Sequence, residues 1–242
     1  MGCDIHMAVE RRIGDRWERV LPPESARDPW LVSQAAKAGD DGWMAKWYPK
    51  RAEVTWYGGR NYTLFGVLAG VRDSNVVPIA EPRGLPDDMS PDVVALIEDY
   101  DSDDIDLGDH SQTWLLLSEI LAYDWDQPYT ADGVVGLREF AERVKNHGEA
   151  IPLKFDGGWA PYDGYCGGTF GPGIYTLEAP DAVRKLRAGG IVESPASRPH
   201  VRDYWTTPLR AQIGDFLTRT VPALQALDPD PSNVRLVFGF DS

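Results

Sequence analysis

The stretch CDIHMAVE at residues 3–10 alternates between two kinds of side chain. One set of alternate positions is apolar (Cys3, Ile5, Met7 and Val9), and the other is mostly polar (Asp4, His6, Ala8 and Glu10). Because successive side chains of a β-strand point to opposite faces, this pattern predicts a half-buried strand. Cys3 would pack on its inner face, and Asp4, His6 and Glu10 would lie on its outer face.

Two further segments extend this strand into a sheet. The segment RIGDRWERV at residues 12–20 places a Gly-Asp turn between two extended stretches, which predicts a hairpin. The segment NVRLVFGFD at residues 233–241 alternates like the first strand and can pair with it. The sequence therefore predicts a sheet that includes both terminal strands.

Apolar residues at helical spacing, together with helix-start residues, predict the remaining elements. Helices are expected at residues 30–38, 62–71, 111–123 (with Ser111 as N-cap), 132–147, 180–189 and 206–227, and a further strand at 52–57. No linker is long enough to divide the chain. We expect one α+β domain over residues 1–242, with a mostly antiparallel or mixed sheet covered by four or five helices.

The composition is typical of a globular protein. The chain is 43% hydrophobic and 11% aromatic, which suffices for a large core. The chain has a net charge of −14 and so lacks the positive surface potential that proteins use to bind duplex DNA; no duplex DNA partner is expected. Cys3 and Cys166 form no CxxC pair, which fits a reducing cytoplasm. No apolar run reaches the roughly 18 residues of a membrane span, so no membrane partner is expected.

The outer face of the first strand carries the strongest chemical signal. Alternate side chains of a strand lie roughly 6–7 Å apart, so Asp4 and His6 can converge on one ion or substrate. Metal-dependent hydrolases usually show two histidines at this spacing, whereas here there is one. His110, in the segment GDHS, is the expected second histidine. We therefore predict a divalent metal ion held by Asp4, His6 and His110.

The predicted catalytic groups are His6, Glu10 and His110, each of which can move protons. The alternative for the GDHS segment is structural: Asp109 and Ser111 cap a helix while His110 points into water. Both interpretations stay open at the level of sequence.

Arginine and aromatic residues predict substrate binding. Guanidinium groups bind phosphate through two hydrogen bonds, and Arg60 and Arg83 lie near a helix start and in a proline-rich loop. A surface salt bridge is the ordinary alternative for each. The segment FDGGWAPYDGYCGGTFGPG at 155–173 offers Trp159, Tyr162 and Tyr165 for stacking on a base, although turn formation explains its composition equally well.

Several common sites are excluded by their motifs. No Walker A loop, Rossmann fingerprint, GxSxG elbow or HExxH helix occurs, so no NAD, FAD or PLP is expected. The acidic run that ends at Asp109 fails as an EF-hand, because Asp104 stands where glycine is needed and His110 where the last ligand is needed. A solvated acidic loop is the favoured interpretation.

Four strings considered together carry a family resemblance: MGCDIH at residues 1–6, GRNYTLFGVLAGVR at 59–72, PRGLP at 82–86 and HSQTW at 110–114. They resemble a family of uncharacterised bacteriophage and prophage proteins that begin with the same hexapeptide. The resemblance covers mainly the first 125 residues and the final strand. It implies a phage context and a bacterial cytoplasm, and it assigns no catalytic residue.

Three functional hypotheses follow. The first is a hydrolase or transferase that acts on a phosphorylated small molecule or nucleotide, with the metal and arginines above. The second is a non-catalytic phage protein that sequesters a nucleotide signal or a host defence component. The third is a protein-interaction or virion-associated module.

Overall fold

A computed structural model describes residues 2–39, 42–98, 107–137, 140–141, 174–191 and 198–241. The chain has an α+β fold with mostly antiparallel strands, as the sequence predicts. It divides into two compact units, Met1–Trp125 with Ile213–Ser242, and Asp126–Gln212. The expected single domain over residues 1–242 stays a prediction, and each unit is described by itself below.

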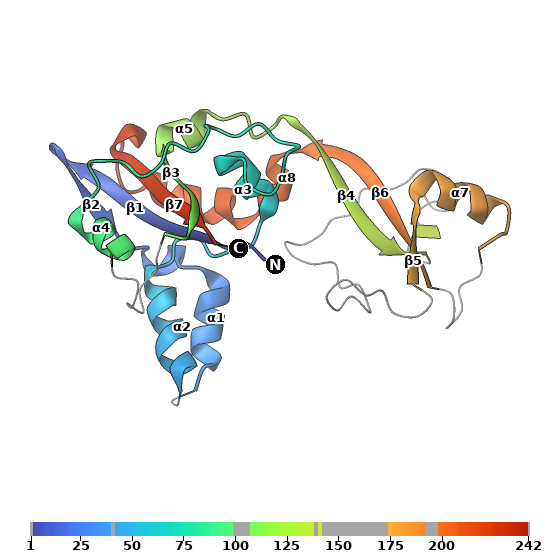
Figure 1. The fold of residues 1–242 in the computed structure, drawn as a ribbon, viewed down its shortest axis with the longest axis horizontal. Coiled ribbons are helices and arrows are strands. Elements are labelled where there is room, and N and C mark those ends of the chain that lie inside the picture. Colours follow the sequence, from blue (N-terminus) through green and yellow to red (C-terminus); the bar gives the residue numbers. More distant parts are fainter. Residues whose placement is uncertain are drawn as a thin grey trace. The chain divides into compact units, whose positions relative to one another are not determined.

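The first unit contains an antiparallel sheet in the order β2-β1-β7-β3. Its strands are β1 (Ile5–Ile13), β2 (Arg16–Val20), β3 (His110–Leu116) and β7 (Val234–Phe240). Strand β1 pairs with β7 from Ile5 opposite Phe240 to Arg11 opposite Val234. Figure 1 shows the first strand (blue) beside the last (red). The predicted pairing of the terminal strands and the predicted hairpin are both confirmed.

Strand β1 is buried on both faces, so the half-buried strand expected from its alternation is wrong. On one face, Phe65 of α3 (Tyr62–Ala69) lies against Phe240, with ring centroids 5.1 Å apart. On the other face, a core cluster joins β1 and β7 to α4 (Pro91–Glu98); its buried members are Ala8, Val93, Leu96, Leu107 and Val237. His6 and Glu10 share the second face and are 8% and 0% exposed. Alternation reports the period of a strand but not what covers each face.

The remaining helices of the first unit are mostly short. They are η1 (Glu24–Ala26), α1 (Pro29–Lys37), α2 (Trp43–Val54), α5 (Leu117–Ala122), the π-helix η2 (Phe216–Thr220), α9 (Val221–Gln225) and η3 (Pro231–Asn233). The short helix α8 (Arg210–Ile213) begins in the second unit, and its last residue, Ile213, is the first residue of the C-terminal segment of the first unit. The helices predicted at 30–38 and 62–71 are confirmed. The strand predicted at 52–57 is wrong, because residues 52–54 end α2. This helix contains Pro49, which removes one backbone hydrogen bond, and it is supported by packing against α1.

The helix predicted at 111–123 is wrong in its first half. Residues His110–Leu116 form β3, and the helix α5 begins only at Leu117. Strand β3 pairs with β7, with Leu115 opposite Leu236. Ser111 is not a helix cap: its φ of 52° lies within the register shift between His110 and Thr113. The free edge of β7 therefore overrides the local helical pattern.

The second unit contains a three-stranded sheet among its described residues, in the order β4-β6-β5. Its elements are β4 (Pro128–Gly136), β5 (Ile174–Glu178), α7 (Ala179–Arg187) and β6 (Arg198–Pro208). Strand β6 pairs antiparallel with β4 and parallel with β5. The helix predicted at 180–189 is confirmed. The helices predicted at 132–147 and 206–227 each begin too early, because residues 132–136 and 206–208 belong to the β4–β6 ladder.

Gly239 permits a close approach between β7 and the segment before β3. A Cβ at this position would lie 2.1 Å from the carbonyl oxygen of Leu107 and 2.9 Å from Cγ of Gln112. We predict that Gly239→Ala lowers the free energy of unfolding by roughly 1–3 kcal/mol, because the backbone must shift to admit the methyl group. Urea unfolding followed by tryptophan fluorescence measures the change.

Gly136→Ala is the matched control, because it also lies in a strand and its Cβ would meet nothing within 4 Å. Equal losses in the two variants would show that the close approach at Gly239 does not govern stability.

Candidate functional site

Four polar side chains meet where β1 begins and β7 ends. We call Asp4, His6, Arg60 and Asp241 the strand-end cluster. The backbone N–H of Asp4 donates to Oδ1 of Asp241 at 2.8 Å, and the N–H of Asp241 donates to the carbonyl oxygen of Asp4 at 3.2 Å. The antiparallel register thus joins groups from opposite ends of the sequence.

The carboxylate of Asp241 is held on both oxygens. Oδ1 accepts from Asp4, and Oδ2 lies 3.2 Å from Nε2 of His6. The two partners differ in exposure: the Asp241 side chain is 47% exposed, whereas that of His6 is 9% exposed. A carboxylate has acceptor positions beyond these two contacts, so Asp241 is oriented and still open to solvent.

Arg60 donates two parallel hydrogen bonds to the carboxylate of Asp4. Its Nε and Nη2 donate to the two carboxylate oxygens at 2.7 and 2.6 Å. The hydrogen bond to Asp4 raises the pKa of Arg60 above its usual value. Arg60 precedes Asn61, whose side chain caps α3 at the N–H of Leu64. The capped helix therefore fixes the backbone next to Arg60, and the two hydrogen bonds to Asp4 orient its guanidinium.

His110 lies apart from this cluster. It pairs with Phe240, whereas His6 pairs with Gly239, so alternation along β7 turns the two histidines to opposite faces of the sheet. The His110 ring stacks on Phe240 at 6.0 Å, and its Nδ1 lies 3.1 Å from Oγ of Ser111. Across the described parts of the chain, no group of three or more His, Cys, Asp or Glu side chains is placed to hold a metal ion. The structure does not bring Asp4, His6 and His110 together, and the metal ion stays a prediction.

Glu10 forms a buried ion pair. Its Oε2 accepts from Nε of Arg235 at 2.6 Å, and its Oε1 accepts from the N–H of Ser90 at 2.6 Å. Arg235 also donates to Asp88 and lies over the ring of Trp17, 4.1 Å from its centroid. Both oxygens of Glu10 are engaged away from solvent, so neither is open to a substrate in this arrangement, and its predicted catalytic role stays a prediction.

Arg83 lies on another part of the surface. It forms two hydrogen bonds to the carboxylate of Glu119, and its guanidinium lies 4.8 Å from the ring centroid of Trp114. Burial raises the pKa of Glu119, but hydrogen bonds from Arg83 and the N–H of Leu116 outweigh it and leave the pKa below its usual value. Arg83 and Arg60 thus each have a carboxylate partner, the alternative that the sequence left open.

The three aromatic residues proposed for base stacking, Trp159, Tyr162 and Tyr165, lie outside the described residues. Cys3 is buried, as its place in the first strand predicts. None of the helices formed by the described residues has the length and hydropathy of a membrane span.

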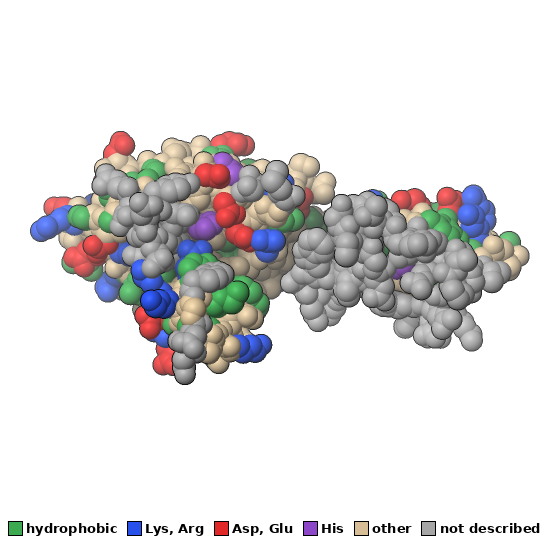
Figure 2. Space-filling model, turned by 60° about the horizontal axis from the view of Figure 1, so that its bottom comes forward, with side chains coloured by type: hydrophobic (Ala, Val, Ile, Leu, Met, Phe, Trp, Pro, Cys, Tyr) green, Lys and Arg blue, Asp and Glu red, His purple; other side chains and the backbone are tan. Residues whose placement is uncertain are grey.

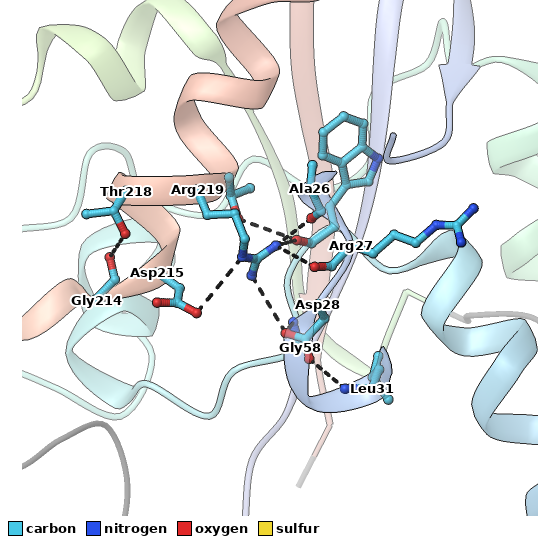
Figure 3. A network of polar contacts seen from close by, with 11 residues as sticks. Ala26, Arg27, Asp28, Leu31, Gly58, Gly214, Asp215, Thr218 and Arg219 are labelled. Carbon is cyan, nitrogen blue, oxygen red and sulfur yellow. Dashed lines mark hydrogen bonds and ion pairs between the residues drawn. The ribbon is translucent and has the colours of Figure 1, made fainter. Parts of the chain in front are cut away.

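Sequence patterns do not single out Arg219, which joins three distant segments (Figure 3). Its Nη1 donates to the carbonyl oxygens of Ala26, Arg27 and Trp56, and its Nη2 lies 3.8 Å from Asp28. The residue lies on the π-helix, an insertion that often accompanies function. Here it orients Arg219 toward carbonyl groups of the chain itself, so we assign it a structural role.

Tyr57 lies beside this network. Its ring is 5.6 Å from that of Phe216, and its side chain is buried. Burial raises the pKa of Tyr57 far above its usual value, and the nearby carboxylates of Asp28 and Asp215 raise it further. The phenol therefore keeps its proton in the folded chain at pH values where an unfolded chain loses it.

No protein-family model, curated protein or solved structure matches the chain significantly.

The Glu10–Arg235 pair gives a stability prediction. We expect Arg235→Met to lower the free energy of unfolding by roughly 3–5 kcal/mol, because it leaves the carboxylate of Glu10 buried without its charge partner. Replacing both residues, as Glu10→Leu with Arg235→Met, recovers part of this loss. Urea unfolding of the single and double variants measures both effects.

Arg184→Met is the control, because Arg184 pairs with Asp181 on the surface, where its side chain is 74% exposed. A loss from Arg235→Met no larger than this control would contradict a stabilising role for the buried pair.

Tyr57 gives a pH prediction. Because its pKa is raised in the folded state, the unfolded chain releases this proton first, and stability falls as pH rises above about 10, by roughly 1.4 kcal/mol per pH unit. Tyr57→Phe removes this part of the slope. Urea unfolding at several pH values between 9 and about 11 measures it.

Tyr62→Phe, at an exposed position in the same unit, should keep the slope of the wild-type chain. The prediction fails if Tyr57→Phe has the same slope as the wild type over that pH range.

Proposed function

We propose that the chain is a hydrolase-type enzyme that acts on a phosphorylated small molecule or nucleotide at the strand-end cluster. One observation carries the proposal: the solvent-open carboxylate of Asp241 is oriented by two donors, beside the exposed guanidinium of Arg60. An oriented base next to an anion-binding group is the minimal arrangement for hydrolysis of a phosphate ester.

Arg60 is the proposed phosphate-binding group. Its ion pair with Asp4 has both side chains 43% exposed. Exposed pairs of this kind contribute only about 0–1 kcal/mol, so a phosphate can displace Asp4 at little cost. The guanidinium fork then offers a phosphate the same two donors that it offers Asp4.

Asp241 is the proposed general base. It takes a proton from a water molecule whose oxygen forms a new bond to phosphorus, while the bond from phosphorus to the leaving oxygen breaks. The leaving oxygen takes up a proton from solvent, so the products are an alcohol and a phosphate. His6 acts as a positioning residue, because its Nε2 lies against the Asp241 oxygen and its side chain is almost closed to solvent.

Glu10 and His110, the other predicted catalytic groups, take no part in the proposed proton transfer. Glu10 is engaged with Arg235, and His110 lies on the other face of the sheet. A divalent metal ion is not part of the proposed step. The phage context and the cytoplasmic setting belong to the proposal, and their support is the resemblance carried by the four strings MGCDIH, GRNYTLFGVLAGVR, PRGLP and HSQTW.

A second candidate function is sequestration of a nucleotide without turnover. The observation that favours it is the stacking of Arg83 over Trp114, because an arginine beside an aromatic ring suits a phosphate linked to a base.

The test is incubation of the full chain with nucleoside phosphates, cyclic nucleotides and sugar phosphates, followed by chromatography of the products. We expect turnover of at least one class. Asp241→Asn should lower kcat by roughly 10²-fold or more, because the amide keeps the shape but accepts no proton. Arg60→Met should raise KM, and Asp4→Asn should lower KM, because Asp4 competes with phosphate for Arg60.

Arg184→Ala, on the surface of α7, is the control that should leave kcat and KM unchanged. A nucleotide that is retained and recovered intact after heat denaturation would replace the hydrolase with the sequestering protein. Absence of both turnover and retention across the panel would refute both candidates.

A further inference from the structure

The helical hairpin α1–α2 carries an exposed apolar surface. We call Trp30, Met44, Trp47, Tyr48 and Arg51 the hairpin patch. Trp30 is 58% exposed and Met44 47% exposed, which is unusual for such large apolar side chains in a chain that buries most of its others. Scattered apolar residues on a surface need no explanation, but Trp30 belongs to a group joined by ring contacts, and Met44 lies one helical turn before Tyr48 of that group.

The rings of the hairpin patch support one another. Trp30 meets Tyr48 edge to face with centroids 5.9 Å apart, and Trp47 meets Tyr48 at 4.9 Å. The guanidinium of Arg51 lies 5.0 Å from the ring centroid of Trp47. These contacts hold the side chains in place before any partner arrives, which lowers the entropy cost of binding.

The charge of the hairpin is opposite to that of the whole chain. Residues 29–54, which comprise α1, α2 and the segment between them, carry four basic side chains (Lys37, Lys46, Lys50 and Arg51) and three acidic ones (Asp40, Asp41 and Glu53), which leaves a surplus of one positive charge. The complete chain has a net charge of −14. Figure 2 shows apolar side chains (green) on the lower lobe of the view, with both Lys or Arg (blue) and Asp or Glu (red) side chains at its margin.

We propose that the hairpin patch docks an acidic segment of a partner protein, with an apolar side chain of that segment packed against Trp30. Trp, Tyr and Arg are the residues that most often dominate protein interfaces, and Met is enriched there. Arg51 lies beside the Trp47 ring, and Lys46 and Lys50 lie on the same helix, so their positive charges complement carboxylates of the partner and speed its approach. This surface is separate from the strand-end cluster.

Single-stranded nucleic acid is the other polyanion that aromatic and basic residues can bind, but the geometry favours it less. Successive bases need a row of open ring faces. Trp47 and Tyr48 are half-buried and lie edge to face, so Trp30 is the most exposed ring of the patch. The exposed side chain of Met44, one helical turn before Tyr48 on α2, adds contact area suited to a protein segment.

The test is selection of a randomised 12-residue peptide display library against the full chain. We expect enriched peptides that combine Asp or Glu with a large apolar residue and contain few Lys or Arg. The binding of a labelled selected peptide should weaken about thirtyfold or more in Trp30→Ala, the effect of a typical tryptophan hot spot. It should also weaken in Lys46→Glu with Lys50→Glu and with rising salt concentration.

Val77→Ala is the matched control, because Val77 is 71% exposed and lies outside the hairpin. It should bind the peptide like the wild type, and circular dichroism checks that every variant is folded. Failure to enrich acidic peptides, or equal binding by Trp30→Ala, would refute the proposal. Tight binding of a 20-residue oligothymidylate that competes with the peptide would assign the patch to nucleic acid instead.

Discussion

The antiparallel pairing of β1 with β7 is the constraint on which the first unit depends. It joins residues that are more than 220 positions apart, such as Glu10 and Arg235, which contact at a separation of 225. Strand β7 also carries β3 on its other edge, so two strands of the sheet need it as a partner. Such a non-local pairing costs the entropy of closing a long loop before its hydrogen bonds and packing contacts stabilise the chain. We therefore expect the last strand to pair late in folding.

The buried Glu10–Arg235 pair gives this ladder a preferred register. Both side chains lie on the face that α4 covers, where Asp88 and the N–H of Ser90 complete their contacts. A slip of one residue would carry Arg235 to the opposite, apolar face of the sheet, which Val234 and Leu236 line at this end of β7. A buried ion pair adds little net stability compared with apolar packing, so its effect is on specificity of pairing.

The candidate site is a consequence of the same ladder. Because the register places Asp4 beside Asp241, the first and last polar residues of the sheet form one cluster at its end. Helix α3, capped by Asn61, brings Arg60 to this end from a separate segment. The hairpin patch is independent of that geometry, because its rings are arranged by the packing of α1 on α2.

The sequence by itself determined the terminal strands, the hairpin at Gly14 and Asp15, and helix α3, because each of these depends on local turns or on a regular apolar period. It also located Asp4, His6 and Arg60. Only the tertiary structure decided that the polar face of β1 is covered, that residues 110–116 form a strand, and that Asp241 and Arg235 are the partners of His6 and Glu10. The physical reason is that side-chain periodicity records the conformation of one segment, whereas burial and pairing depend on which distant segment lies against it.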